Sequence, residues 1–157
     1  KLRTAFLTAS ACLFLLASAS GALASDRTYV NPRFGTTITF NAAIFTTMDP
    51  PPENGDGGRW RAPDGAELAV WGQNNVLDFT PESLADFVSK DIAEVTYRKV
   101  GARWMVLSGF ASGKIVYHRA EFGARGVIHS MEMRYPSDLR KHYDLLASRI
   151  AESLIGP

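Results

Sequence analysis

Residues 103–135 read RWMVLSGFASGKIVYHRAEFGARGVIHSMEMRY, and this stretch decides the fold class. It contains three runs rich in β-branched and aromatic residues, namely 103–110, 114–122 and 127–135. Glycine-containing segments separate the runs, which is typical of a meander of antiparallel hairpins. The first run is apolar at both alternating sets of positions. We therefore expect it in the centre of the sheet, covered on both faces.

A helix is expected on each side of the meander in the sequence. Thr80, Pro81 and Glu82 predict a helix start, because threonine caps, proline suits the first position and glutamate favours the positive end of the dipole. The apolar stripe of this helix consists of Leu84, Phe87, Val88, Ile92 and Val95. After Pro136 and Ser137 a second helical stripe consists of Leu139, Tyr143, Leu146, Ile150 and Leu154, and Gly156 ends it.

The part of the chain before the first helix predicts strands. Residues 28–40 predict one strand whose inward face carries Phe34, Thr36, Ile38 and Phe40. Residues 59–62 and 66–72 predict a hairpin around the turn 63–65. The order is then hairpins, helix, meander, helix. This order predicts an α+β fold with an antiparallel sheet, an amphipathic helix in the middle and one at the C-terminus.

The first 24 residues have the pattern of a secretory signal peptide. A basic start at Lys1 and Arg3 precedes the uncharged apolar run 4–16, and the motif Ala22-Leu23-Ala24 suits signal peptidase. We expect residues 1–24 to be a signal peptide and residues 25–157 to be a single α+β domain, periplasmic or secreted. The mature chain would have no second hydrophobic run and so no transmembrane segment.

Cleavage after Ala24 changes the composition of the chain. It removes Cys12, the only cysteine, and two of the 17 basic residues, which leaves 15 against 16 acidic residues. A chain without cysteine has no disulfide, no thiolate nucleophile and no cysteine-ligated zinc. Its near-neutral charge argues against nucleic acid as a partner. We expect no cofactor.

Two loops are candidates for partner binding. Residues 50–60, PPPENGDGGRW, resemble the middle of an EF-hand calcium loop. Pro52 and Pro63 occupy the first and last ligand positions of such a loop and offer no side-chain oxygen. The segment is therefore better explained as a rigid bend than as a calcium site. Residues 31–35, NPRFG, contain an arginine that either anchors an anion or is simply solvated. We expect the loops around 31–35 and 53–58 to form one working edge. The candidate partner-binding residues are Asn31, Arg33, Glu53, Asn54 and Asp56.

A second candidate site depends on the register of the last hairpin. If residues 123–126 form a four-residue loop, His118 pairs with Met131, and His118, His129, Met131 and Met133 share one face. Imidazole and thioether ligands suit Cu(I). The alternative is a packed face with methionine as filler, and a slip of one residue would place one histidine on the opposite face.

No residues are expected to be catalytic. The segment 109–113, GFASG, does not fit G-x-S-x-G, although Ser108 or Ser112 with His118 or His129 remains a formal possibility for a serine hydrolase.

Two resemblances follow from these residues. The segments YVNPRFGTTITF, PPENGDGGRW, PDGAELAVWG and WMVLSG, with the closing helix, resemble a group of small exported bacterial proteins of unknown function. The order of elements is similar to the PsbP-like fold, shared by an extrinsic photosystem subunit and exported bacterial lipoproteins. That resemblance implies an α/β/α sandwich and an accessory or binding role.

We therefore expect an exported non-enzymatic binding or accessory protein with a protein or envelope component as partner. The alternatives are a copper-handling protein and a serine-dependent envelope hydrolase.

Overall fold

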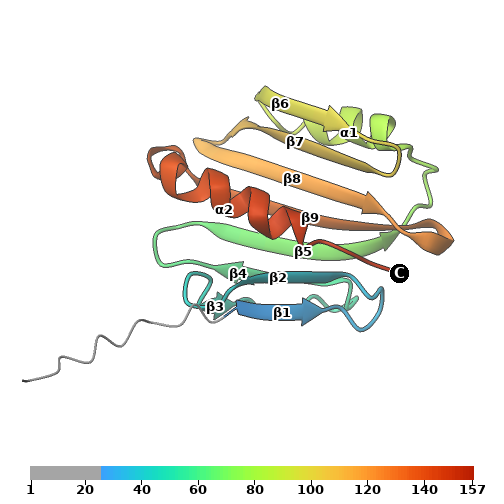
Figure 1. Ribbon diagram of the computed structural model, residues 1–157, viewed down its shortest axis with the longest axis horizontal. Coiled ribbons are helices and arrows are strands. Elements are labelled where there is room, and N and C mark those ends of the chain that lie inside the picture. Colours follow the sequence, from blue (N-terminus) through green and yellow to red (C-terminus); the bar gives the residue numbers. More distant parts are fainter. Residues whose placement is uncertain (1–25) are drawn as a thin grey trace, which may run out of the picture.

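A seven-stranded antiparallel sheet is the central layer of the computed structural model, which describes residues 26–157 (Figure 1). From one edge to the other its strands are β3 (Thr47–Met48), β4 (Gly57–Arg61), β5 (Glu67–Asn74), β9 (Val127–Pro136), β8 (Lys114–Phe122), β7 (Trp104–Ala111) and β6 (Glu94–Val100). Two further strands, β1 (Asp26–Val30) and β2 (Thr37–Asn41), form a separate hairpin. The helices are α1 (Pro81–Ser89) and α2 (Arg140–Glu152), and the short 3₁₀ turns are η1 (Ala124–Gly126) and η2 (Ser137–Leu139).

This architecture confirms the predicted α+β class, with its antiparallel sheet, a helix in the middle of the chain and a helix near the C-terminus. Residues 1–24 lie outside the described residues, so the signal peptide stays a prediction. Within residues 26–157, no helix is long enough and apolar enough to cross a membrane.

The two helices lie on opposite faces of the sheet. Along β9, Met131 and Met133 pack in the same cluster as the buried residues of α2, whereas Ile128, which points the other way, packs with those of α1. Helix α2 contacts β9, β8 and β2, and α1 contacts β7 and β6. The β1–β2 hairpin shares the face of α2, because Ile38 and Phe40 belong to the α2 cluster. Each helix therefore packs on only some of the strands of its face.

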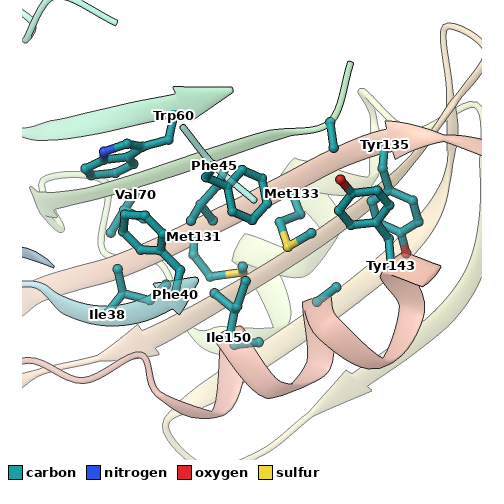
Figure 2. Packing of buried hydrophobic residues seen from close by; sticks show 14 of the residues in the cluster. Ile38, Phe40, Phe45, Trp60, Val70, Met131, Met133, Tyr135, Tyr143 and Ile150 are labelled. Atoms are coloured by element: carbon teal, nitrogen blue, oxygen red, sulfur yellow. The ribbon is translucent and has the colours of Figure 1, made fainter. Parts of the chain in front are cut away.

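The core beneath α2 is rich in aromatic rings. Trp60 on β4 is almost fully buried, with Phe40 at 4.8 Å and Tyr29 at 4.9 Å between ring centroids. Figure 2 shows aromatic rings at both ends of this cluster, with Met131 and Met133 between them. Full burial of such a side chain contributes about 1.5–3 kcal/mol, so this layer is a main source of stability.

Helix α1 begins as predicted but is shorter. Thr80 Oγ1 accepts a hydrogen bond from the Ser83 backbone N–H, and Ser83 Oγ accepts one from the Thr80 N–H. This capping box therefore gives a partner to two backbone N–H groups that have none within the helix. The helix ends at Ser89, and the expected continuation through Val95 is wrong, because residues 94–100 form the edge strand β6. Ile92 still packs beneath α1, which explains why the apolar spacing looked helical beyond the helix end.

Two strand predictions are also corrected. Residues 28–40 do not form one strand, because residues 31–36 turn the chain and pair β1 with β2. Gly35 has a φ of +71°, a backbone conformation that glycine adopts without strain. The run 103–110 corresponds to β7, but β7 is second from the edge, and the central strand is β9. The three strands of the meander are otherwise confirmed as neighbours in the expected order.

Candidate functional site

The two loops expected to form one edge do meet, and Asn31 joins them. Asn31 Oδ1 accepts hydrogen bonds from the backbone N–H groups of Arg33 (3.1 Å) and Phe34 (2.8 Å). Its Nδ2 donates to the carbonyl oxygen of Gly55 (2.9 Å) and to Tyr29 Oη (3.2 Å). Since Asn31 is only 1% exposed, it fixes the loops from inside and offers no surface to a partner.

The other candidate loop residues lie near the surface. Arg33 Nη1 donates to the backbone carbonyl of Asn54 (2.5 Å), and Asn54 Nδ2 donates to Asp56 Oδ2 (2.7 Å). Glu53 is exposed on the same loop. The structure thus brings together Arg33, Asn54 and Asp56 as one chain of contacts. Whether this edge binds a partner stays a prediction. Among residues 26–157, no group of three or more histidine, cysteine, aspartate or glutamate side chains is placed to hold a metal ion.

A broad uncovered area of the sheet lies beside these loops. We call it the open face: the side chains that point out from β4 and β5, and from the ends of β9 and β8 that carry Glu132, Arg134 and Lys114, on the side of the sheet that carries α1. A hollow of about 540 Å³ lies where the loop 49–58 borders this face. Pro50, Pro52 and Asp56 line it from the loop, and Arg59, Trp71 and Glu132 line it from the strands.

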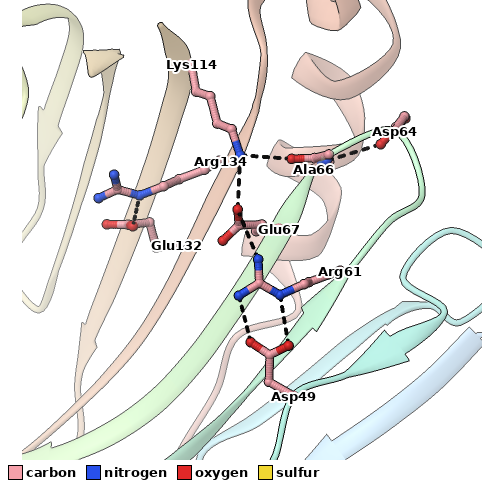
Figure 3. Close-up of polar contacts among 9 residues, drawn as sticks. Asp49, Arg61, Asp64, Ala66, Glu67, Lys114, Glu132 and Arg134 are labelled. Atoms are coloured by element: carbon pink, nitrogen blue, oxygen red, sulfur yellow. Dashed lines mark hydrogen bonds and ion pairs between the residues drawn. The ribbon is translucent and has the colours of Figure 1, made fainter. Parts of the chain in front are cut away.

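Most charges of the open face neutralise each other (Figure 3). Arg61 makes a bidentate pair with Asp49, with Nε–Oδ1 at 2.8 Å and Nη2–Oδ2 at 2.9 Å. Glu67 lies between Arg61 (3.4 Å) and Lys114 (3.0 Å). These residues come from β4, β5, β8 and the segment after β3, so the network ties the strands together as well as balancing charge.

Glu132 is the most strongly held acid of the open face. Its Oε1 accepts from Arg134 Nε at 2.6 Å, and its Oε2 lies 3.3 Å from His118 Nδ1. Burial alone would raise the pKa of the Glu132 carboxyl, but the hydrogen bonds and charges of His118 and Arg134 outweigh burial and lower the pKa from 4.5 to about 2. The carboxylate is therefore ionised at neutral pH. The ring of His118 also packs edge-on against Trp71, with 5.5 Å between centroids.

Arg59 differs from Arg61 and Arg134 because its guanidinium forms no salt bridge in the described part of the chain, although its charge helps Arg61 to lower the pKa of Asp49. Its side chain is exposed, and no ion pair or hydrogen bond joins it to another residue of 26–157. It lines both the 540 Å³ hollow and an adjoining polar one of about 290 Å³. Trp71, half-buried, lines the larger hollow with it. An unpaired guanidinium near a flat indole can hold a carboxylate and an apolar group at the same time.

The predicted histidine and methionine face is not assembled. The last hairpin has a three-residue loop, because Gly123 pairs with Val127 and the 3₁₀ turn η1 lies between them. His118 consequently pairs with Glu132, not with Met131, and points to the open face. His129, Met131 and Met133 point to the other face, where all three are fully buried. The prediction that all four share a face is wrong.

His129 is a packed residue of the core. Its Nδ1 lies 2.8 Å from Thr36 Oγ1, and a Cβ added to Gly156 would lie 2.1 Å from its Nε2. Burial lowers its pKa, which favours the neutral ring. The His129 side chain thus packs between β9 and both the β1–β2 hairpin and the C-terminal segment.

The two serines considered as nucleophiles have no histidine partner in the described chain. Ser108 lies on β7, opposite Tyr117 and facing α2, whereas His118 points through the other face. Ser112 is exposed in the turn between β7 and β8, with a φ of +51°. Neither serine hydrogen bonds to a histidine within residues 26–157. A nucleophile activated by an adjacent base is therefore not formed at either position.

Comparisons with known proteins support the fold assignment. No protein-family model and no curated protein matches the chain. The solution structure of cyanobacterial PsbP (CyanoP) from Synechocystis sp. PCC 6803 superposes with a TM-score of 0.59 and 15% sequence identity, over 90% of this chain and 99% of that one. The chain has the PsbP-like fold. At this identity the similarity concerns the fold alone, so the predicted α/β/α arrangement is confirmed and no activity follows from the likeness.

Sequence reasoning missed the open face. The sequence pattern predicts only that Arg59 and Trp71 lie in the two strands of a hairpin, and it gives Glu132 and Arg134 no role. A signal existed, because Glu132 and Arg134 alternate with buried methionines along one strand. That alternation marks a strand with one polar face. It does not tell whether a helix covers that face, which depends on tertiary packing.

Proposed function

We propose that the protein is an exported, non-enzymatic binding protein that holds an acidic segment of a protein partner on the open face. The observation that carries this proposal is Arg59, an exposed guanidinium that forms no salt bridge in the described chain and lines a hollow of about 540 Å³ together with Trp71. Arginine and tryptophan are enriched among the residues that contribute most to protein interfaces.

The charge pattern selects the partner. Asp49, Glu67 and Glu132 each have a basic neighbour, so a cationic segment that contacts any of these three acids would have to compete with an existing ion pair. An acidic segment can bind Arg59 without breaking an existing ion pair. The loop 49–58 forms one wall of the hollow and is stiffened by its prolines, which limits the conformational entropy lost on binding.

The two alternative functions have weaker support. The copper-handling function relied on four side chains that lie on two faces of the sheet. The hydrolase function relied on a serine–histidine pair that is not formed in the described chain.

Peptide binding tests the proposal. A fluorescein-labelled peptide of alternating glutamate and phenylalanine should bind saturably, and added salt should weaken binding because the contact is exposed and charged. Arg59→Ala should weaken binding about tenfold, the effect of losing one charge-assisted contact. The matched control is Arg149→Ala, an exposed arginine on α2 and on the opposite face, which should bind like the wild type.

Three outcomes would contradict the proposal. One is absence of saturable binding of the glutamate peptide. The second is equal binding of the same peptide with lysine in place of glutamate. The third is an equal loss of affinity in the Arg59 and Arg149 variants, which would indicate attraction by net charge alone.

Export has its own test. When the full chain is expressed in a bacterium, the protein should be recovered from the periplasm with Ser25 as its first residue. Recovery of uncleaved chain from the cytoplasm would refute the export part of the proposal and leave the binding test unaffected.

A further inference from the structure

A second hollow, of about 400 Å³, lies on the other face of the sheet, beside α2. Helix α2 packs over β9, β8 and β2 and leaves β7 and β6 uncovered on this side. The hollow lies where the helix stops and these two strands continue. Ser108 and Phe110 of β7 form part of its lining, and they point away from the open face because they alternate with Leu107, which packs beneath α1.

The wall of this hollow is rich in aromatic rings. Tyr97, Phe110, Tyr117 and Tyr135 all line it. Tyr135 is buried and belongs to the core, but Tyr97 is 49% exposed on an edge strand, where packing does not require an aromatic ring. An exposed ring beside two half-buried rings, Phe110 and Tyr117, around a hollow is more typical of a ligand site than of a plain surface.

The charged groups of the hollow, Arg140 and Asp144, form an ion pair and balance each other. Asp144 accepts a hydrogen bond from Tyr135 Oη through Oδ1 (2.8 Å) and one from Arg140 Nε through Oδ2 (3.0 Å). Arg140 also lines the hollow, and its terminal nitrogens are further donors. The hydroxyl groups of Ser108 and Ser148 also line it, and each can donate or accept.

This combination limits the class of ligand. Arg140 disfavours a cation and Asp144 disfavours an anion, so the hollow suits an uncharged molecule. To pack against the aromatic rings, the ligand needs a flat apolar surface. To hydrogen bond to the serines and Arg140, it also needs several hydroxyl or carbonyl groups. A sugar ring has both, since its C–H groups form an apolar face and its hydroxyls lie around the edge. We propose that this hollow is a binding site for a neutral saccharide, which stacks on Tyr97 and Tyr117 and hydrogen bonds to Ser108, Ser148 and Arg140.

The saccharide site is independent of the proposed function, because the open face lies on the other side of the sheet. Either site can therefore fail its test without affecting the other.

NMR titration of the isotope-labelled protein tests this inference. The probes are chitotetraose and maltotetraose, each to about 10 mM, the range expected for a shallow site. At least one should shift the backbone signals of Ser108, Phe110 and Tyr117 saturably. Tyr97→Ala should weaken that binding about tenfold, the effect of one aromatic contact.

The control variant is matched in exposure and chemistry. Phe87 on α1 is 50% exposed, against 49% for Tyr97, and lies on the opposite face. Phe87→Ala should change the affinity by less than about twofold. Tyr117→Phe keeps the ring and removes the hydroxyl, so it should retain most of the binding if stacking is the main contribution.

The inference would be overturned by any of three results. The first is that neither oligosaccharide produces a saturable shift at these signals. The second is that saccharide binding is unaffected by Tyr97→Ala. The third is that 4-hydroxybenzoate binds the hollow while both saccharides do not, which would assign it to aromatic acids.

Discussion

Asn31 and Gly55 are 24 residues apart in sequence, yet the Asn31 amide nitrogen donates a hydrogen bond of 2.9 Å to the Gly55 carbonyl oxygen. This bond joins the turn of the β1–β2 hairpin to the proline-rich loop that borders the open face. The shape of that border therefore depends on a buried amide and not on the surface residues of either loop.

Replacing Asn31 tests this dependence. Asn31→Ala removes four hydrogen bonds from a buried position and should lower the free energy of unfolding by about 2 kcal/mol, measured by urea denaturation. Asn31→Asp keeps the acceptor for the Arg33 and Phe34 N–H groups and should lose less. Asn54→Ala, at an exposed position of the same loop, should change stability by under about 0.5 kcal/mol. Equal effects of the alanine variants at positions 31 and 54 would refute the role given to Asn31.

The Glu132 carboxyl predicts a pH dependence of stability. Its pKa in the folded protein, about 2, is below its ordinary value of 4.5, so the unfolded chain binds its proton more readily. The stabilisation is complete above pH 4.5 and is lost as the pH falls from 4.5 toward 2. It amounts to at most about 3.4 kcal/mol. Glu132→Gln should make the unfolding free energy less dependent on pH in this window. A variant profile parallel to that of the wild type would contradict the ion-pair arrangement around Glu132.

Gly72 is required by the close approach of the β1–β2 hairpin to β5. A Cβ at this position would lie 2.4 Å from Phe34 Cβ and 2.5 Å from Thr36 Oγ1. Gly72→Ala should therefore displace the hairpin and cost about 2–3 kcal/mol, measured by thermal or urea unfolding. The control is Gly126→Ala, which has open space around it but a φ of +69°, and should cost only about 1 kcal/mol of backbone strain. A smaller loss for the Gly72 variant than for the control would show that the hairpin does not rest on β5 at this point.

Local patterns predicted most of the elements of this fold, and the errors have identifiable causes. The edge strand β6 is exposed on both faces, its polar–apolar alternation covers only residues 94–98, and Val95 also continues the helical spacing of α1. The β1–β2 hairpin was read as one strand because its turn depends on the side chain of Asn31, which a propensity argument does not include.

The candidate site was predicted in part. The meeting of the two loops was inferred from their composition, and the structure places them in contact. The open face and the saccharide hollow were not foreseen, because both exist only where α1 and α2 leave parts of the sheet uncovered. The coverage of each face is decided by packing across the sheet, and no single segment carries that information.

The register of the β8–β9 hairpin leads to a prediction about copper. Arg125 adopts a φ of +60°, a conformation that is uncommon for a residue other than glycine, and this shortens the loop to three residues. The one-residue shift places His118 on the open face, while His129 stays in the core with Met131 and Met133. Among the described residues, the four proposed ligands therefore do not meet at one site, and the three that share a face are fully buried. Buffered Cu(I) added under anaerobic conditions should leave the melting temperature unchanged, whereas tight binding to the native state would raise it by several degrees. A rise that disappears in both His118→Ala and His129→Ala would show that the two histidines act together and that this register is wrong.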